Sequence, residues 1–193
     1  MRIVGGRLRG LQLTTGAEAG ATLRPTSDRS RESLFNILAH NDRFRRGDGP
    51  APHGLAVLDV FAGSGALGLE AWSRGAKTVG FIENDGGSLS ALKTNQKRAK
   101  ASIRDVVIYQ RDATAPGPAP ARFDLVLMDP PYQKDLAPVS LAALVKGGWL
   151  TDGALIVVET DKREKPDWPE GVTVLRERKS GRAMLWFLEY AAD

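Results

Sequence analysis

The chain has 193 residues, with 27 lysines and arginines against 23 acidic residues and a formal net charge of +4 at pH 7. That length corresponds to one domain, or to one domain with a small appendage, and a core of that size needs no disulfide staples. The absence of cysteine excludes disulfides, Cys-ligated zinc, iron–sulfur clusters and thiol nucleophiles.

The sequence contains no recognisable signal peptide and no apolar run of about 18 residues that could span a membrane. We therefore expect a cytoplasmic protein that does not contact a membrane. We also expect a monomer without a metal site.

The N-terminal part of the chain predicts a small hairpin followed by one helix. Residues 1–15 alternate loosely between apolar side chains and glycines, which indicates a β-hairpin, and residues 16–26 read as a loop. A capped helix is expected over residues 27–40, and a linker rich in proline and glycine follows it. We accordingly divide the chain into an N-terminal extension, residues 1–46, and a main domain, residues 47–193.

The main domain alternates short apolar runs with helical segments. Strands are expected at residues 55–60, 77–83, 105–110, 123–129 and 153–159, and helices at about 66–74, 87–100 and 136–146. This alternation predicts an α/β fold with an open, mostly parallel sheet and helices on both faces. Two further strands, at about 172–177 and 184–190, are too close together for a crossover helix, so they form a hairpin. The predicted sheet therefore has seven strands and an antiparallel edge strand.

Arginine is concentrated in the N-terminal extension. Residues 1–46 contain nine arginines and no lysine against four acidic residues, so this segment carries more than the whole chain's excess of positive charge. Because the planar arginine fork binds phosphate oxygens bidentately, we expect nucleic-acid contact here, with a solvated basic face as the alternative. The expected RNA contacts are Arg2, Arg7, Arg9, Arg29 and Arg31.

A glycine turn follows the first expected strand of the main domain. The run Gly63-Ser64-Gly65-Ala66-Leu67-Gly68 fits the G-x-G-x-x-G pattern of dinucleotide sites, but Asp59 lies four residues before Gly63. A carboxylate so close to the turn would repel a pyrophosphate and favours a ligand with a cationic part. S-adenosylmethionine, with its sulfonium and ammonium groups and no phosphate, has that chemistry. Alternatively, Asp59 only caps the turn by accepting its N–H groups, and the two roles are compatible.

Two further acids follow the next strands. Glu83 ends the second strand and can accept both ribose hydroxyls of such a donor, unless it is simply a surface glutamate. Asp112 follows the third strand, where a carboxylate can accept from the adenine amino group. Ligands bind at the carboxyl ends of strands in open α/β sheets, so the sequence predicts a donor site at this edge.

The stretch Asp129-Pro130-Pro131-Tyr132 comes directly after the fourth strand, and its prolines predict a stiff, exposed turn. An exocyclic amine on a base is a poor nucleophile, because its lone pair is delocalised into the ring, and it must become pyramidal to attack a methyl group. The Asp129 carboxylate and the Pro130 carbonyl are two acceptors that favour this shape. Tyr132 offers a face on which the base can stack. The motif therefore predicts methyl transfer to a base that leaves its stack or already lies in a loop.

These segments together resemble a known family. "DVFAGSGALGLEAWSRGA", "FIEND" and "LVLMDPPY" resemble the motifs of class I S-adenosylmethionine-dependent amino-methyltransferases. "MRIVGGRLRGLQL" and "LRPTSDRSRESLFNIL" closely resemble the start of the RsmD-type bacterial 16S rRNA guanine-N2 methyltransferases. The Asp-Pro-Pro-Tyr motif is shared with adenine-N6 enzymes, so the N-terminal block alone indicates the RsmD type.

The resemblance implies a Rossmann-like class I methyltransferase with S-adenosylmethionine as methyl donor. It implies that the N2 amine of guanine 966 in 16S rRNA is methylated within a small ribosomal subunit particle. It also implies that Arg24 and Thr26 lie near the methionine end of the donor and that Asp112 and Ala113 flank its adenine. The donor turn and ribose site implied by the resemblance comprise Asp59, Phe61, Gly63, Ser64, Gly65 and Glu83.

Three other functions share parts of this pattern. An adenine-N6 nucleic-acid methyltransferase usually needs a target-recognition region, for which 193 residues leave little room. A protein glutamine methyltransferase usually carries Asn-Pro-Pro-Tyr, from which Asp129 departs. A catalytically silent rRNA-binding assembly factor is disfavoured because both the acid–glycine turn and the Asp-Pro-Pro-Tyr motif are intact.

Overall fold

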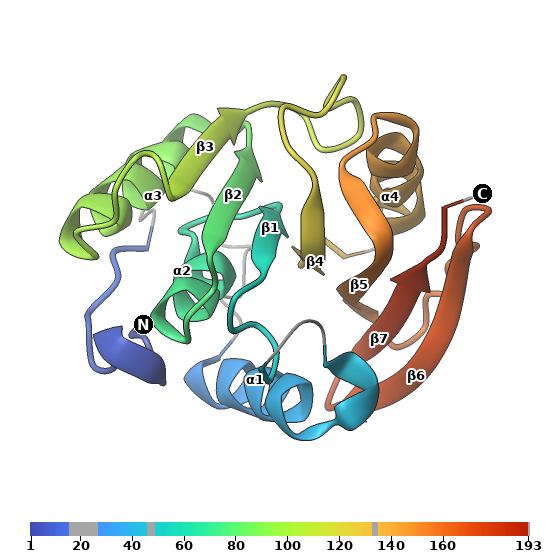
Figure 1. The fold of residues 1–193 in the computed structure, drawn as a ribbon, viewed down its shortest axis with the longest axis horizontal. Helices are drawn as coiled ribbons and strands as arrows, with labels where there is room; N and C mark the ends of the chain where they lie inside the picture. The colour runs from blue at the N-terminus through green and yellow to red at the C-terminus, as the bar shows by residue number, and fades with distance from the viewer. Residues whose placement is uncertain (16–26, 46–48, 133–134, 193) are drawn as a thin grey trace.

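The computed structural model describes residues 1–15, 27–45, 49–132 and 135–192. Its centre is a single sheet of seven strands (Figure 1). The strands are β1 Ala56–Val60, β2 Thr78–Glu83, β3 Val106–Gln110, β4 Phe123–Met128, β5 Leu150–Asp161, β6 Val172–Ser180 and β7 Ala183–Tyr190. They lie in the order β3-β2-β1-β4-β5-β7-β6, with β7 antiparallel to both of its neighbours and the first five strands mutually parallel. The mostly parallel sheet and the closing hairpin are therefore confirmed.

Helices cover both faces of the sheet, as the alternating pattern predicts (Figure 1). They are α1 Asp28–His40, α2 Ala66–Ser73, α3 Gly86–Arg98 and α4 Leu136–Lys146, with short 3-10 helices η1 Gly6–Leu8 and η2 Asp42–Phe44. Apolar side chains of α1, α2 and α3 pack in one hydrophobic core, and those of α4 pack in a second core on the opposite face. Among the described residues, no helix is long and apolar enough to cross a membrane.

Two helix starts are fixed by side chains that the sequence marks as caps. The hydroxyl of Ser27 accepts a hydrogen bond from the Ser30 N–H at 3.1 Å and begins α1. The Asp85 carboxylate accepts from the Ser88 N–H at 2.8 Å and begins α3. Each cap satisfies an N–H group that has no partner inside the helix.

The N-terminal extension shares its core with the main domain. Its predicted hairpin is reduced to one isolated antiparallel bridge between Arg2 and Gln12, with η1 inserted in the connection. Ile3 is fully buried in the same apolar core as α2, and the Phe44 ring stacks on Phe187 of β7 with 4.9 Å between centroids. The predicted boundary after residue 46 falls among residues 46–48, outside the described chain.

Candidate active site

Four carboxylates form a row across four neighbouring strands, within two residues of the carboxyl ends. In sheet order they are Glu83 on β2, Asp59 on β1, Asp129 after β4 and Glu159 on β5. The residues two positions before them all pack in the core beneath α1, α2 and α3: Phe81, Val57, Leu127 and Val157. Because side chains alternate between the faces of a strand, the four carboxylates point to this same face.

The glycine turn between β1 and α2 is built around two of these carboxylates. Asp59 accepts a hydrogen bond from the Gly68 N–H at 2.8 Å, and Glu83 accepts from the Gly63 N–H at 2.7 Å. Phe61 has the left-handed backbone conformation, with φ of 61°, which a residue with a side chain adopts at a cost of about 1–3 kcal/mol. Such strained residues cluster at ligand sites, in agreement with the position of Phe61 in the expected donor turn.

Two glycines of the motif are required for distinct physical reasons. Gly65 caps α2 with φ of 80°, and an added Cβ would lie 2.3 Å from the Leu92 Cδ1 atom. Gly68 lies inside α2, where an added Cβ would lie 2.4 Å from the Phe81 Cε1 atom. Gly68 is therefore required because α2 packs closely on the sheet. This glycine of the motif stabilises the fold and is needed whether or not a ligand is bound.

The electrostatics of this turn favour a cationic ligand. Asp59 is 1% exposed, and burial raises the pKa of its carboxyl well above 3.8, with the Asp129 and Glu83 charges raising it further. The Gly68 N–H opposes that rise only in part. A positive charge nearby would stabilise the ionised form of Asp59, and the sulfonium and ammonium of S-adenosylmethionine supply such charges. The residues present therefore fit that donor.

The two expected adenosine contacts have backbone partners of their own. Glu83 accepts from the Asn84 and Asp85 N–H groups, each at 2.8 Å, in addition to Gly63. A carboxylate offers about four lone-pair sites, so Glu83 has capacity for a ribose hydroxyl beyond these three bonds. Asp112 is exposed and accepts from the Thr114 N–H and hydroxyl, which lower the pKa of its carboxyl.

Other expected donor residues differ in what the structure shows of them. Ala113 is buried beside Asp112, and the Ser64 carbonyl accepts from the Asn95 amide. Arg24 and Thr26 lie outside the described residues.

The Asp129-Pro130-Pro131-Tyr132 turn leaves the sheet next to the glycine turn. Pro130 is buried, Asp129 and Pro131 are half-buried, and Tyr132 is 40% exposed. The Tyr132 hydroxyl donates a hydrogen bond of 2.6 Å to Glu159. Burial raises the pKa of Glu159, and the bond from Tyr132 partly offsets this. Tyr132 thus offers an exposed ring that is tied to the next strand of the sheet.

Glu159 is not singled out by the sequence analysis, although its position in the sequence follows the same pattern as the other site acids. It is an acid near the carboxyl end of a parallel strand, as Asp59 and Glu83 are. Asp129 and Glu159 line one small cavity together with Ser30 and Leu34 of α1. The two carboxylates therefore face the same space.

Asn95 is a second residue that sequence reasoning missed. Its buried amide donates to the Thr14 and Ser64 carbonyls at 2.8 and 2.9 Å and accepts from the Thr14 N–H at 2.8 Å. Asn95 thereby joins the N-terminal extension to the donor turn. A lone asparagine in a helix carries no local signal of such contacts.

Four of the five arginines expected to bind RNA are exposed: Arg2, Arg7, Arg9 and Arg29. The Arg2 guanidinium forms a 3.5 Å ion pair with Asp28. The guanidinium of Arg7 lies 4.2 Å from the centre of the Trp72 ring, which holds its long side chain against α2.

The prediction for Arg31 is wrong. This side chain is fully buried, and its guanidinium donates to the Asp28 carboxylate at 2.8 Å and to the Arg2 carbonyl. A contact of 3.9 Å joins it to Glu70, which also binds Arg74 at 2.7 Å. Arg31 binds neighbouring parts of the fold and presents no surface to RNA.

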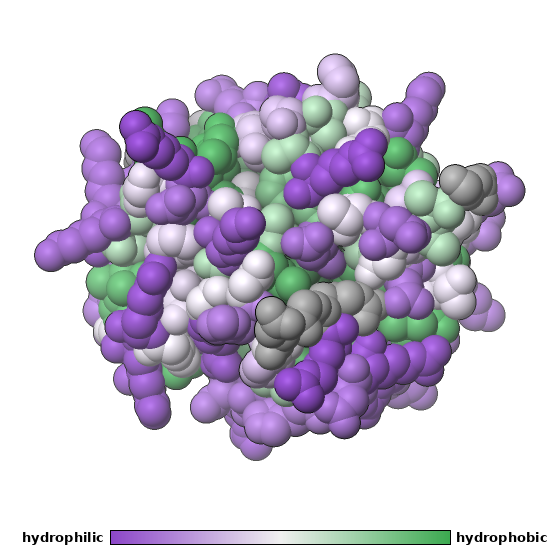
Figure 2. All heavy atoms as spheres, in the orientation of Figure 1, coloured by the Kyte–Doolittle hydropathy of each residue, from purple (hydrophilic) through white to green (hydrophobic). Residues whose placement is uncertain are grey.

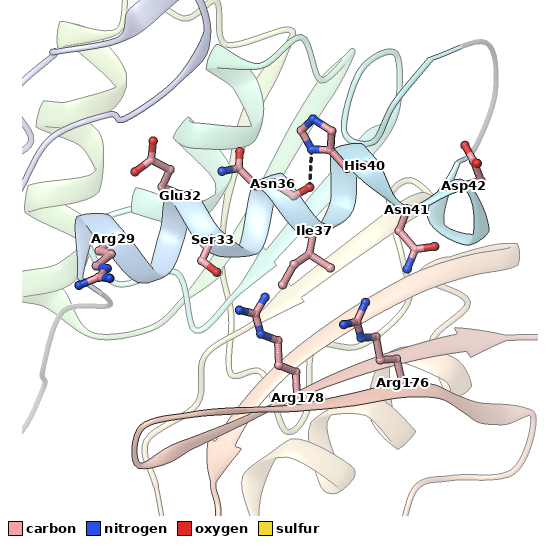
Figure 3. Close-up of a pocket in the computed structure, with 10 residues that line it drawn as sticks. All are labelled: Arg29, Glu32, Ser33, Asn36, Ile37, His40, Asn41, Asp42, Arg176 and Arg178. Carbon is pink, nitrogen blue, oxygen red and sulfur yellow. Dashed lines mark hydrogen bonds between the residues drawn. The ribbon is translucent and has the colours of Figure 1, made fainter.

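A polar groove separates α1 from β6. Its volume is about 720 Å³, and Arg29 of α1 lines it opposite Arg176 and Arg178, which point from β6 toward the helix (Figure 3). Glu32 and Asp42 also line it, and Asp42 pairs with Arg45 at 3.7 Å. Hydrophilic side chains gather along this lower rim of the molecule (Figure 2).

Residues 1–189 match the protein-family model described as Conserved hypothetical protein 95. The chain is 38% identical over 185 residues to the Ribosomal RNA small subunit methyltransferase D of Haemophilus influenzae, covering 94% of this chain and 89% of that protein. It is also 38% identical over 184 residues to the protein of the same name from Escherichia coli K12, covering 94% and 86% respectively. The solved structure of the Escherichia coli protein yhhF matches with a TM-score of 0.80 at 34% identity, covering 100% of this chain and 99% of that one.

Proposed function

Because the chain belongs to the RsmD family of methyltransferases, we propose that it methylates the N2 amine of guanine 966 in 16S rRNA, with S-adenosylmethionine as donor. In this proposal the protein acts as a cytoplasmic monomer on small ribosomal subunit particles. The names of its curated relatives, which specify small-subunit rRNA, support this class of substrate.

One observation carries the proposal: the donor turn and the acceptor turn lie side by side. Strands β1 and β4 are paired in parallel, with Val60 opposite Met128. The glycine turn begins directly after Val60, and the Asp-Pro-Pro-Tyr turn begins directly after Met128. A methyl donor bound at the first turn therefore lies next to an amine held at the second.

Each turn supplies a different part of the chemistry. S-adenosylmethionine supplies an electrophilic methyl group on a positively charged sulfur. Asp59 and Glu83 hold the donor by charge and hydrogen bonds, while Asp129 and the Pro130 carbonyl accept hydrogen bonds from the N–H groups of the target amine. Tyr132 stacks on the base. Catalysis then consists mainly of alignment and charge placement, with no covalent enzyme intermediate.

The N-terminal extension and the groove between α1 and β6 provide the RNA contacts in this proposal. Arg29 and Arg178 line the groove, while Ser30 and Ser180, close to them in the chain, line the cavity beside Asp129. The groove and the cavity therefore adjoin at the start of α1 and the end of β6. An RNA strand that places its base at Asp129 can lay its phosphates along the groove and along the exposed arginines of residues 1–46.

The direct test uses labelled S-adenosylmethionine and small subunits from a strain that lacks the modification. The RNA is digested to nucleosides, and the labelled product is identified by mass. We expect N2-methylguanosine, and no transfer to particles in which guanine 966 is replaced by adenine. N6-methyladenosine would show that the target base is adenine and would refute the guanine assignment. Label in protein, or no transfer at all, would refute the proposal that the protein is an RNA methyltransferase.

A variant assigns the chemistry to Asp129. We expect Asp129→Ala to bind the donor like the wild type in calorimetry and to lose methyl transfer by orders of magnitude. Asp167→Ala, which changes an exposed aspartate far along the chain, is the matched control and should retain full activity. An active Asp129→Ala variant would refute the assignment.

A further inference from the structure

Glu159 lies where the second polar group of a target base would be. Leu127 and Met128 of β4 pair with Val157 and Val158 of β5, so Asp129 and Glu159 follow at the same level on neighbouring strands. Adjacent strands are about 4.8 Å apart, and both carboxylates line the same small cavity. A base whose amine is held at Asp129 therefore brings its next ring atoms within reach of Glu159.

The hydrogen bonds of Glu159 leave it able to read that base. Its Oε1 atom accepts the Tyr132 hydroxyl at 2.6 Å. An ionised carboxylate has two oxygens with about four lone-pair sites and no hydrogen, so Glu159 can accept further bonds and cannot donate one. The Tyr132 bond also fixes the orientation of the carboxylate relative to the ring on which the base would stack.

Guanine and adenine differ at the atom that this carboxylate would meet. In guanine, N1 is next to the carbon that carries the N2 amine, and it bears a hydrogen. In adenine, N1 bears only a lone pair, which a carboxylate repels. We propose that Glu159 selects guanine by accepting a hydrogen bond from N1–H while Asp129 holds the adjacent amine. This inference rests on the proposed function and extends it to the choice of base.

The order of the four carboxylates supports this assignment. Across the sheet they run Glu83, Asp59, Asp129 and Glu159. The first two serve the donor in the proposed function and the third serves the target amine. Glu159 is the next group beyond the amine, on the side away from the donor, where the rest of the base's Watson–Crick edge must lie. A flipped base is commonly read along that edge.

The test replaces the target guanine by 2-aminopurine, which carries the same amine but has an N1 that only accepts. Small subunits are reconstituted from 16S rRNA ligated with a synthetic segment that carries either base at position 966. We expect wild-type kcat/KM to fall by about 100-fold or more on 2-aminopurine, because a carboxylate built to accept is left facing a lone pair.

Glu159→Gln provides the decisive comparison. The carbonyl of the introduced amide can still accept the Tyr132 hydroxyl, which turns the amide N–H groups toward the base. We therefore expect the variant to have a lower kcat/KM on guanine and a higher kcat/KM on 2-aminopurine than the wild type. The ratio of the two kcat/KM values should fall at least about 10-fold. An unchanged preference in a variant that still binds the donor would overturn the inference.

Two controls separate base reading from support of Tyr132. Tyr132→Phe keeps the carboxylate and removes the hydroxyl, so it should slow both substrates by a similar factor and preserve the preference. Glu177→Gln changes an exposed glutamate of β6 and should match the wild type on both. If Tyr132→Phe narrows the preference, the Tyr132→Phe, Glu159→Gln double variant decides: a preference narrowed no further than in Tyr132→Phe alone means that Glu159 acts only through Tyr132, and the inference fails. A wild-type protein inactive on the guanine particle would instead refute the proposed function.

Discussion

Arg29 and Arg31 are two positions apart on α1, yet the structure gives them opposite roles, and paired alanine variants test this. Arg31 is fully buried against Asp28 and Glu70, whereas Arg29 is exposed in the groove. Removing one partner of a buried ion pair costs about 3–5 kcal/mol, because a buried charge loses its partner. Glu70 keeps its 2.7 Å ion pair with Arg74 when Arg31 is removed. The loss of unfolding free energy in Arg31→Ala should therefore lie near the lower end of that range, at about 3 kcal/mol.

The assay is urea and thermal unfolding of both variants, followed by RNA binding at a temperature where each is folded. For a chain of this size, about 3 kcal/mol lowers Tm by roughly 6–12 °C. Arg29→Ala should change stability by less than about 0.5 kcal/mol and should weaken RNA binding instead. If Arg31→Ala unfolded like the wild type and bound RNA less tightly, the structural role of Arg31 would be refuted.

Three other perturbations test the packing and charges of the site. Gly68→Ala places a Cβ 2.4 Å from the Phe81 ring, so we expect a loss of about 1–3 kcal/mol in the urea unfolding free energy. Burial raises the pKa of Glu159 above 4.5. The contribution of this carboxyl to folding stability therefore falls as pH rises through the pKa of the folded protein. Over the same interval the carboxyl becomes ionised, so its ability to accept a hydrogen bond from N1–H increases. At saturating S-adenosylmethionine, which keeps Asp59 ionised, the kcat/KM of the wild type for RNA should therefore rise with pH over that interval, and Glu159→Gln should remove this rise. Combined Arg176→Ala and Arg178→Ala should reduce the slope of log K against log salt by about 0.7 per lost phosphate contact, measured by filter binding to 16S rRNA.

The elements that sequence predicts well are those whose signals are local. The helix expected at 136–146 is found at Leu136–Lys146, and Asp85 caps α3 as expected. By contrast, β5 begins at Leu150, three residues earlier than predicted. The Thr-Asp-Gly sequence resembles a turn, but the strand passes through it because Leu150 pairs with Phe123 beside an irregularity in the ladder. Pairing with a distant strand overrides a local turn signal there.

The candidate site shows the same division. Asp59, Glu83 and Asp129 follow apolar runs, so their place at the carboxyl edge of the sheet is predictable from sequence. The prediction for Arg31 fails because charge alone does not reveal burial, which depends on Glu70 of another helix. The contacts of Asn95 likewise depend on residues far away in the chain.

The stack of Phe44 on Phe187 has a consequence for biosynthesis. About 140 residues separate these rings, and Phe187 belongs to the last strand along the chain. At ribosomal rates of about 5–20 residues per second, Phe44 waits roughly 7–30 seconds for its partner to be synthesised. During that interval Phe44 lacks the strand on which it stacks, so the end of the N-terminal extension docks late, although Ile3 can already pack against α2. A nascent chain stalled before β7 should therefore remain protease-sensitive around Phe44.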